Sequence, residues 1–422
     1  MSRINAPRGT ADTLPADSWK WQAVEAIARD VATVYHFAEI RTPIYEYSEL
    51  FHRGVGETTD IVSKETFTFS DRGGDSITLR PEGTAGVVRA AIENNLLAQE
   101  GSRQKLFYIG PNFRYERPQK GRLRQHHQFG VEAFGIAEPQ QDVECILLQL
   151  DFYRRCGVKE FSLQINSLGD KESKGRYRDA LVKFLTPKSS QLSEDSRRRL
   201  TENPLRILDS KDPRDQSAVI GAPPALESLS DKSRAHFQNI QAMLKDRSIP
   251  FMVNPNLVRG FDYYTGTVWE ATTSGLGAQN AIGGGGRYDN LVEILGGRGT
   301  PGVGFGIGLE RLLIALDAQQ VTLPDPRRPL VWLAALGPAA RQAAWNLLAE
   351  LRAAGIVADM DLADRSMKAQ FKIADREAAK FCLILGDNEL AKGEVTLKNL
   401  QTGDQSSVPR TEIISRVKSA IS

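Results

Sequence analysis

The stretch "VRGFDYYTG", residues 258–266, places an arginine, a carboxylate and two adjacent tyrosines between two glycines. A guanidinium group donates hydrogen bonds to phosphate or carboxylate oxygens, and phenols can complete a polar pocket around it. As a strand, the stretch would send Arg259 and Tyr263 to one face and Asp262 and Tyr264 to the other. An Arg259–Asp262 pair that only decorates a strand edge explains the stretch alone equally well.

A second group of residues with chemical potential forms a basic loop. Its charged residues are Arg114, Glu116, Arg117, Lys120, Arg122 and Arg124. Several converging arginines can neutralise the oxygens of a triphosphate. Just after the loop, Gln128 and Glu132 have the same parity and would face the same side of an otherwise apolar strand. This pattern favours a polar pocket, and an exposed solubilising loop is the alternative.

Glycines dominate two further stretches, "GGGGRYD" at 283–289 and "VGFGIGLERL" at 303–312. Glycine at alternate positions clears one strand face, so that a ligand can lie against it. Close packing of a helix on a sheet would use the same glycines. Neither stretch has the spacing of a dinucleotide-binding fingerprint or a P-loop.

Periodicity predicts the elements that position these residues. Apolar spacing indicates helices over 18–37 and from 139, and another helix that begins near Pro81. Strand-like segments flank the basic loop, and Asp71–Asp75 reads as the turn of a hairpin.

Two composition changes indicate the domain organisation. Residues of about 170–245 are charged and helical between proline-containing loops, which is typical of an inserted helical module. "LPDPRRP", residues 323–329, reads as a linker. We therefore expect a first domain over 1–325, the end of the linker at 326–329, and an α/β domain over 330–422.

The overall composition is that of an ordinary globular protein, with 422 residues, 41% hydrophobic and 25% charged residues, and a net charge of +2. No apolar run reaches the roughly 20 residues that cross a bilayer, and the first residues lack the apolar stretch of a signal peptide. Cys145, Cys156 and Cys382 lack CxxC spacing and indicate reduced thiols. We expect a cytoplasmic protein without a membrane segment or a structural metal.

Taken in order, the motifs resemble those of bacterial histidyl-tRNA synthetases, which are class II aminoacyl-tRNA synthetases. The arginine-bearing strand–loop–strand looks like motif 2, and "GIGLERL" looks like motif 3. The motifs that carry the resemblance are "RGTADTLP", "LRPEGTA", "FRYERPQKGRLRQHHQ", "LVRGFDYYTG", "GGGGRYDNL" and "GFGIGLERL".

The resemblance implies a multidomain fold of mixed α and β structure. Its parts are a mainly antiparallel sheet of six or seven strands flanked by helices, a helical insertion, and a C-terminal α/β anticodon-binding domain. It also implies a histidine–tRNA ligase, which activates L-histidine with ATP and Mg²⁺ and transfers it to the 3′ end of tRNA(His). A homodimer is implied, with its interface near the N-terminal helix.

Matching the motifs residue by residue implies the site. The catalytic residues would be Arg114 and Arg259, which clamp the α-phosphate. Histidine would be bound by Glu82, Gly83, Thr84, Arg114, Gln128, Glu132, Arg259, Tyr263 and Tyr264. ATP would be bound by Arg114, Glu116, Arg122, His126 and Arg311. The tRNA acceptor end would meet Arg117 and Gln119, and the anticodon would lie near Arg365, Lys368 and Lys372. His126 stands where the family commonly has a phenylalanine that stacks on adenine.

Two other functions are compatible with parts of this pattern. The regulatory subunit of ATP phosphoribosyltransferase resembles the same family and binds histidine without catalysis. Such proteins typically lack a C-terminal domain like that of residues 330–422. An RNA-binding module without catalysis would explain the basic loop, but not the pocket expected at Gln128 and Glu132.

Overall fold

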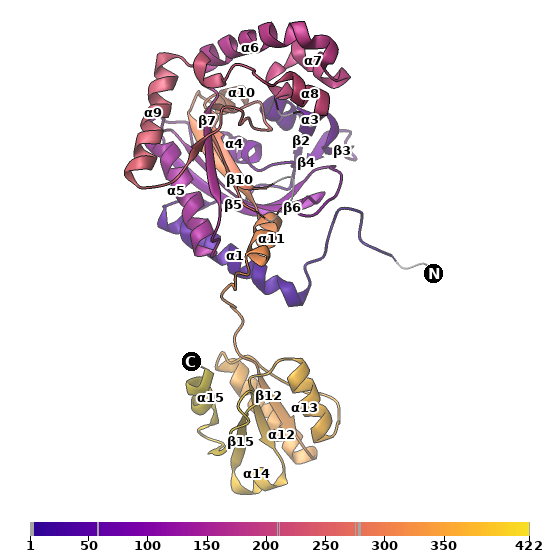
Figure 1. Ribbon diagram of the computed structural model, residues 1–422. Helices are drawn as coiled ribbons and strands as arrows, with labels where there is room; N and C mark the ends of the chain where they lie inside the picture. Colours follow the sequence, from indigo (N-terminus) through magenta and orange to yellow (C-terminus); the bar gives the residue numbers. More distant parts are fainter. Residues whose placement is uncertain are drawn as a thin grey trace. The chain divides into compact units, whose positions relative to one another are not determined.

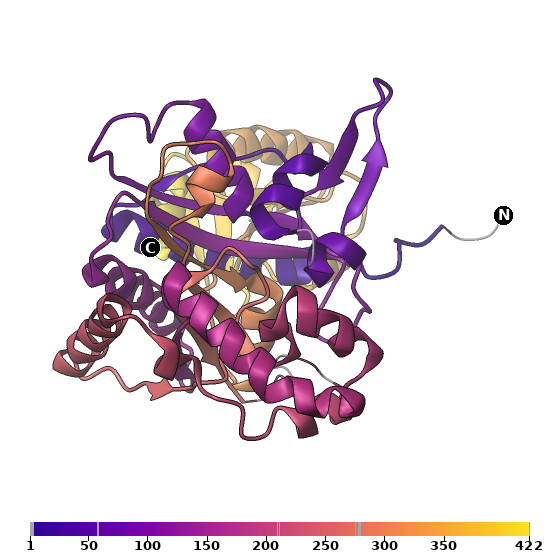
Figure 2. The same ribbon diagram turned by 90° about the horizontal axis from the view of Figure 1, so that it is seen from above.

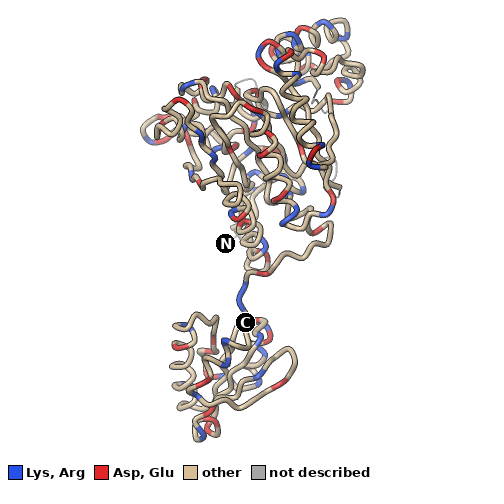
Figure 3. Tube along the Cα trace, turned by 90° about the vertical axis from the view of Figure 1, so that its left-hand side faces the viewer, with Lys and Arg blue, Asp and Glu red and all other residues tan. Residues whose placement is uncertain are grey.

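The computed structural model describes residues 4–56, 59–208, 210, 212–274, 276 and 280–421. The chain forms two compact units, Met1–Asp325 and Pro326–Ser422. Lys and Arg are interspersed with Asp and Glu along both units (Figure 3). Within the described ranges, no helix has the length and apolar character needed to cross a membrane.

An eight-stranded sheet is the centre of the first unit (Figure 1). Its six inner strands are antiparallel, as expected, and a two-residue strand adds in parallel at each edge. In spatial order the strands are β1 (Ala38–Glu39), β5 (Gln104–Phe113), β6 (Gln125–Phe134), β11 (Gly302–Gly308), β10 (Ala281–Arg287), β9 (Thr265–Thr272), β7 (Ser162–Ser167) and β8 (Met252–Val253).

Helices cover both faces of this sheet. The helices α1 (Pro15–Val34), α5 (Pro139–Arg155), α9 (Asp231–Asp246) and α11 (Leu309–Ala318) bury their apolar residues against one face. On the other face, α4 (Thr84–Glu93) and the short α10 (Leu291–Ile294) leave part of the sheet open. The sheet is therefore a rigid floor that is accessible from the α4 side.

The ends of two helices differ from the sequence expectation. Helix α1 begins at Pro15, three residues earlier than expected, because proline already has the φ angle of a first helical turn. It ends before His36, whose φ of 60° is left-handed. Helix α4 begins at Thr84 and not near Pro81, because Glu82 caps it.

A small three-stranded sheet lies in the same unit. The hairpin of β3 (Phe67–Ser70) and β4 (Ser76–Leu79) turns through residues 71–75 as predicted, and β2 (Tyr45–Tyr47) adds to β4. Between β2 and β3 lie the short helices α2 (Ser48–Phe51), η1 (His52–Gly56) and α3 (Asp60–Lys64).

The helical module expected over about 170–245 begins after β7. Its helices α6, α7 and α8 gather at one end of the unit, and α9 runs along α5 (Figures 1 and 2). The module has small apolar clusters of its own. Before α9, the elements are α6 (Lys171–Leu185), η2 (Thr186–Gln191), α7 (Glu194–Glu202), η3 (Pro204–Ile207), α8 (Pro213–Ala218) and η4 (Ala225–Ser228).

The interpretation of residues 258–266 as a strand is wrong. Residues 254–264 form a loop, and β9 begins only at Thr265. The backbone carbonyls of Gly260 and Asp262 accept hydrogen bonds from side chains of the insertion and not from a neighbouring strand. The loop nevertheless delivers its arginine and tyrosines to one place, as described below.

The second unit is a five-stranded mixed sheet with helices packed on it. Its strands, in spatial order, are β13 (Ala358–Met360), β12 (Val331–Ala335), β14 (Phe381–Leu385), β15 (Glu394–Asn399) and β16 (Gln405–Pro409). Its helices are α12 (Pro338–Ala353), α13 (Met367–Arg376), α14 (Asp387–Lys392) and α15 (Ile413–Ile421). Helix α14 and strand β16 were not expected from the sequence, because both are short and mostly exposed.

Candidate active site

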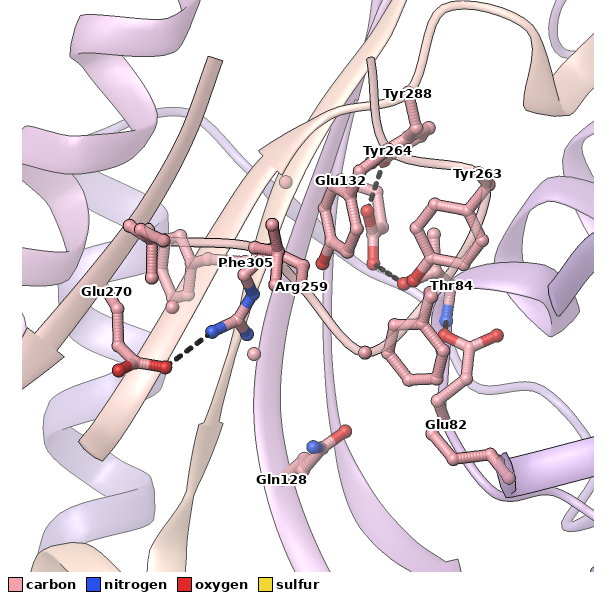
Figure 4. Close-up of a pocket in the computed structure, with 18 of the residues that line it drawn as sticks. Glu82, Thr84, Gln128, Glu132, Arg259, Tyr263, Tyr264, Glu270, Tyr288 and Phe305 are labelled. Carbon is pink, nitrogen blue, oxygen red and sulfur yellow. Dashed lines mark hydrogen bonds and ion pairs between the residues drawn. The ribbon is translucent and has the colours of Figure 1, made fainter. Parts of the chain in front are cut away.

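A cavity of about 340 Å³ opens on the face of the eight-stranded sheet beside α4. Strands β6, β11 and β10 form its floor, and the start of α4 and the loop of residues 254–264 form its walls. Figure 4 shows Arg259 and Glu270 on one side of this cavity and Glu82 and Thr84 on the other. We call it the first cavity.

The start of α4 is held by a buried carboxylate. Glu82 accepts hydrogen bonds from the backbone N–H groups of Thr84 at 2.6 Å and Ala85 at 2.8 Å, which suits a negative charge at a helix N-terminus. Burial raises the pKa of Glu82 against these hydrogen bonds. Gly83 does not line the cavity; a Cβ there would collide with the ring of Tyr108.

Glu132 lies on the floor of the first cavity and is surrounded by hydroxyl groups. It accepts hydrogen bonds from Thr84 Oγ1 at 2.8 Å, from Tyr108 at 3.3 Å and from the hydroxyl of Tyr288 (Figure 4). Burial raises the pKa of Glu132 to about 8, with a smaller contribution from Glu82, while the hydroxyl donors oppose the rise. The carboxyl group therefore holds a proton at neutral pH when the cavity contains no ligand.

The glycines of β11 make room for this carboxyl group. Gly304 pairs with Glu132, and a Cβ on Gly304 would collide with the carboxylate. Gln128 lies two pairs further along the floor, where its Oε1 accepts a hydrogen bond from Asn112 Nδ2 at 2.7 Å. The expectation that Gln128 and Glu132 face one polar pocket is confirmed by the structure.

Arg259 reaches the first cavity from the loop. Its Nη1 donates to Glu270 on β9 at 2.8 Å, and its buried Nε has no hydrogen-bond partner among the described residues. The alternative of an Arg259–Asp262 surface pair is wrong, because Asp262 accepts hydrogen bonds from Arg206. The guanidinium group is thus fixed at one end and retains donors for a ligand.

The two tyrosines of the loop also line the first cavity. Tyr263 and Tyr264 are 4% and 6% exposed, and their ring centroids are 4.7 Å apart. Tyr263 stacks on Phe261 at 5.1 Å, which fixes its ring. Burial raises the pKa of both phenols, so they remain protonated hydrogen-bond donors.

A second cavity, of about 420 Å³, adjoins the first. The two cavities share six lining residues: Arg114, Gln128, Arg259, Glu270, Gly284 and Gly306. Arg114 Nε donates to the carbonyl oxygen of Pro81 at 2.9 Å, which holds the arginine at this junction. The second cavity also contains an ion pair between Arg122 and Glu116.

The remaining walls of the second cavity come from β6 and α11. Burial lowers the pKa of His126 to about 3, with help from nearby positive groups, so its ring is neutral. Arg311 Nε donates to the carbonyl oxygen of Ala281 at 2.7 Å. Glu310 accepts from His127 Nδ1 at 2.9 Å. The second cavity thus combines fixed cations with an uncharged ring.

Most of the residues predicted for the site line these two cavities. The first contains Glu82, Thr84, Arg114, Gln128, Glu132, Arg259, Tyr263 and Tyr264, and the second contains Arg114, Glu116, Arg122, His126 and Arg311. Arg117 and Gln119 line neither cavity and are exposed in the loop between β5 and β6.

The cavity-lining residues that were not anticipated include Tyr108, Glu270, Tyr288 and Glu310. Tyr288 directly follows the glycine run and its arginine, so its position was visible in the sequence without its role. Arg287 of the same stretch is structural, because it forms a buried ion pair with Asp142 on α5. Glu270 could have been found as the one charged residue of an otherwise apolar and hydroxyl-bearing strand.

Comparison with known families identifies the chain. The family model described as "Histidyl-tRNA synthetase" matches residues 9–312, which include both cavities and the insertion. The chain belongs to the histidyl-tRNA synthetase family. A second model, described as "Anticodon binding domain", matches residues 331–420 of this synthetase.

Curated relatives of the synthetase agree over nearly the whole chain. A histidine–tRNA ligase of Streptococcus gordonii is 50% identical over 407 residues, which cover 96% of each chain. One of Geobacillus sp. strain WCH70 is 50% identical over 418 residues, which cover 99% of each chain.

Solved structures give the same family. The apo histidyl-tRNA synthetase of S. aureus matches with a TM-score of 0.84 and 38% identity, covering 98% of this chain and 99% of that one. A Bacillus halodurans structure titled as an ATP phosphoribosyltransferase regulatory subunit/histidyl-tRNA synthetase is 20% identical, with a TM-score of 0.67 over 92% of this chain, and shares the fold. Because the curated relatives at about 50% identity are histidine–tRNA ligases, the regulatory alternative is not favoured.

Proposed function

We propose that the first cavity binds histidine, the second binds ATP, and Arg114 and Arg259 hold the reacting atoms where the cavities meet. The observation that carries this proposal is the shared wall, since an amino-acid carboxylate and an α-phosphate must touch for activation. A carboxylate oxygen attacks the α-phosphorus, and the bond to the β-phosphate breaks. Histidyl-adenylate forms and pyrophosphate leaves with the bonding electrons.

The first cavity selects histidine by hydrogen bonds to both ends of the substrate. Glu82, Thr84 and Gln128 offer oxygen atoms to its ammonium group. Glu132 and Tyr264 line the same cavity and take the two imidazole nitrogens. Because the hydroxyls around Glu132 are already in place, a substrate that cannot hydrogen-bond leaves buried groups unpaired.

The second cavity binds the nucleotide through cations and a flat ring. Arg122 and Arg311 take the outer phosphates, and His126 faces the adenine. Mg²⁺ arrives as part of the substrate, on the β- and γ-phosphates. The described residues contain no cluster of three or more ligand-type side chains that could hold a metal ion, and Glu116 and Glu270 are each paired with an arginine.

The tRNA is bound at two places. Arg117 and Gln119 are exposed in the loop that borders the second cavity and meet the acceptor end of tRNA(His). In the second unit, Arg365, Lys368 and Lys372 are exposed at the start of α13 and approach phosphates of the anticodon loop. Transfer follows when a hydroxyl of the terminal ribose attacks the histidyl carbonyl and AMP leaves.

The hollow of about 500 Å³ in the second unit fits an unstacked anticodon base. It is lined by Trp345, which is 50% exposed, together with Met360, Leu362 and Arg341. An exposed indole ring beside an arginine is a stacking platform of the kind that single-stranded bases use.

A second copy of the chain covers the small sheet of β2, β4 and β3. This sheet and the residue before it expose an apolar surface on the first unit. Its side chains are between 44% and 61% exposed and belong to Ile44, Tyr45, Tyr47 and Phe69. Large exposed apolar patches mark association sites. We assign the homodimer interface to this surface and the neighbouring N-terminal segment, and we place the dimer in the cytoplasm.

Histidine-dependent ATP–pyrophosphate exchange tests the proposal. The full chain should exchange pyrophosphate with histidine and not with other amino acids, and it should charge tRNA(His). A chain that ends at Asp325 should retain exchange and charge tRNA poorly, because the first unit has its own core and both cavities. A folded full chain without exchange would favour a regulatory or RNA-binding role, and full charging by the fragment would contradict the anticodon assignment.

A further inference from the structure

The backbone of the loop that supplies Arg259 and both tyrosines is not paired with a strand of the sheet, although Arg259 bonds to Glu270 on β9 and both tyrosines are buried against the sheet. Its first half is anchored to the core, because Asn166 Nδ2 donates to the carbonyl oxygens of Pro255 and Leu257. Its second half, residues 258–264, contains no strand, and its backbone bond to the core, from Asp262 N to Val55 O, is long at 3.4 Å. Its conformation must therefore depend on other contacts.

One group of these contacts comes from the helical insertion, through one arginine of η3. Arg206 Nη2 donates to the carbonyl oxygen of Gly260 at 2.7 Å and to Asp262 Oδ1 at 3.0 Å, and its Nε reaches the same carboxylate oxygen at 3.3 Å. Gly260 follows Arg259 in the chain, and Asp262 precedes Tyr263. One planar guanidinium group thus binds the loop next to Arg259 and next to Tyr263.

Two more residues of the insertion reach the same aspartate. Asn203 Nδ2 donates to Asp262 Oδ1 at 3.0 Å, and Lys174 Nζ donates to the carbonyl oxygen of Asp262 at 3.4 Å. Burial lowers the pKa of Lys174 to about 8, which is the effect of enclosing an ammonium group beneath the loop. Asp262 is therefore the point at which the insertion holds the loop.

The space behind the loop is not filled. A cavity of about 260 Å³ separates parts of the insertion from the rear of the loop, and it is lined by Lys174, Arg206, Phe261 and Tyr264. Arg259 and Tyr264 line both this rear cavity and the first cavity. Because apolar packing is incomplete on this side of the loop, the polar contacts of Arg206 contribute to its position there.

We propose that Arg206 is a positioning residue for histidine activation, which holds the 258–264 loop in its substrate-binding conformation through Gly260 and Asp262. The insertion is then part of the amino-acid site, in addition to any contact that it makes with tRNA. This inference rests on the proposed function of the first cavity. It predicts that the removal of Arg206 weakens the binding of histidine. The binding of ATP should stay nearly unchanged, because Arg122 and Arg311 lie on other elements.

The test is Arg206→Ala in the full-length protein. The KM for histidine in pyrophosphate exchange should rise by about tenfold or more, as expected for lost charge-assisted hydrogen bonds. The KM for ATP should stay within about twofold. Hydrogen exchange of the amides in residues 258–264 should accelerate, while exchange in α4 and β6 stays as in the unaltered protein. Arg206→Lys should recover part of the histidine KM, because lysine retains the charge and loses the fork.

Three comparisons make the outcome decisive. Arg214→Ala removes an exposed arginine of the same insertion, which forms an ion pair with Asp212, and should leave both KM values unchanged. Asp262→Asn should raise the histidine KM, and its combination with Arg206→Ala should add little further. If a thermal scan shows that Arg206→Ala is unfolded, the two KM values and the hydrogen exchange of the loop can be measured in Asp262→Asn and Arg206→Lys instead.

An unchanged histidine KM with unchanged loop exchange would overturn the inference. Acceleration of exchange throughout α6 and α7 without a change in the loop would also overturn it, since Arg206 would then only stabilise the insertion. If the unaltered protein shows no histidine-dependent exchange, the proposed function fails instead, and the two failures are distinguishable.

Discussion

The two adjoining cavities are built on opposite principles. In the first, the polar groups are buried and already hydrogen-bonded to one another, and Glu132 is 1% exposed. In the second, long cationic side chains stand at a more open surface, and the side chain of Arg122 is 39% exposed. The first cavity thus has fixed hydrogen-bond geometry, and the second has an excess of positive charge.

This difference corresponds to two kinds of ligand. A small, neutral ring with two nitrogens is distinguished from isosteres only by preformed partners that would otherwise remain unpaired. A triphosphate is distinguished by its charge, which long arginines can follow through several conformations. Arg114 and Arg259 belong to both cavities, so they should behave unlike the other residues of either one.

Arg259→Gln should give the largest effect. Loss of a fixed cation beside the α-phosphate should lower the rate of adenylate formation by at least about 10²-fold, the scale of one transition-state donor. Single-turnover formation of histidyl-adenylate measures this rate, and retained ATP binding is the control. A rate within about threefold of the unaltered protein, roughly 0.6 kcal/mol in barrier, would contradict the role of Arg259.

Glu132→Gln should change the KM for histidine and leave the KM for ATP unchanged. An amide in place of the buried carboxyl group has only one acceptor oxygen for the three surrounding hydroxyls and an imidazole N–H, and the KM for histidine should rise about 10- to 100-fold. Steady-state pyrophosphate exchange at varied histidine measures the change. An equal rise in the KM for ATP would show that the two cavities do not bind histidine and ATP independently.

Arg122→Ala should show the opposite selectivity. The KM for ATP should rise by about tenfold, since one charge-assisted contact with a phosphate is lost. The KM for histidine should stay nearly constant, because Arg122 lies outside the first cavity. The effect should shrink at high salt, as screening weakens the contribution of a partly exposed cation. A histidine-specific effect would reverse the assignment of the two cavities.

The stability of the ligand-free protein should depend on pH through Glu132. Its pKa is raised from 4.5 to about 8, so between these values the folded protein holds a proton that the unfolded chain has released. A rise in pH across this window therefore lowers stability. Thermal scans at pH 5 and pH 8 should show a smaller loss for Glu132→Gln than for the unaltered protein. An identical loss in both would mean that Glu132 does not hold this proton.

His126→Phe should have the smallest effect. Because the pKa of His126 is lowered to about 3, its ring is neutral at physiological pH, and a phenylalanine ring offers adenine a similar flat surface. The KM for ATP should change by less than about threefold, which is about 0.6 kcal/mol. Measurements at pH 6 and pH 8 should agree for both proteins. A tenfold change would mean that a ring nitrogen contacts the nucleotide.

Much of this site was visible in the sequence because it depends on local order. Strand parity placed Gln128 and Glu132 on one face, and the alternate glycines that follow Val303 indicated a cleared floor. The motif set then gave the family, the multidomain fold and most cavity-lining residues. These inferences need only the sequence order, since side-chain direction in a strand repeats every two residues.

The contacts between distant segments were decided by the tertiary structure alone. Arg259 of the loop forms an ion pair with Glu270 on β9, Tyr288 just after β10 donates to Glu132 on β6, and Arg206 of η3 contacts residues 260–262. Alternation even gave the wrong answer for residues 258–264, because a loop has no fixed side-chain period. The sequence by itself determined which groups this protein brings to its site. Only the folded chain decided which of them touch, because the partners of a buried group are chosen by packing and not by distance along the sequence.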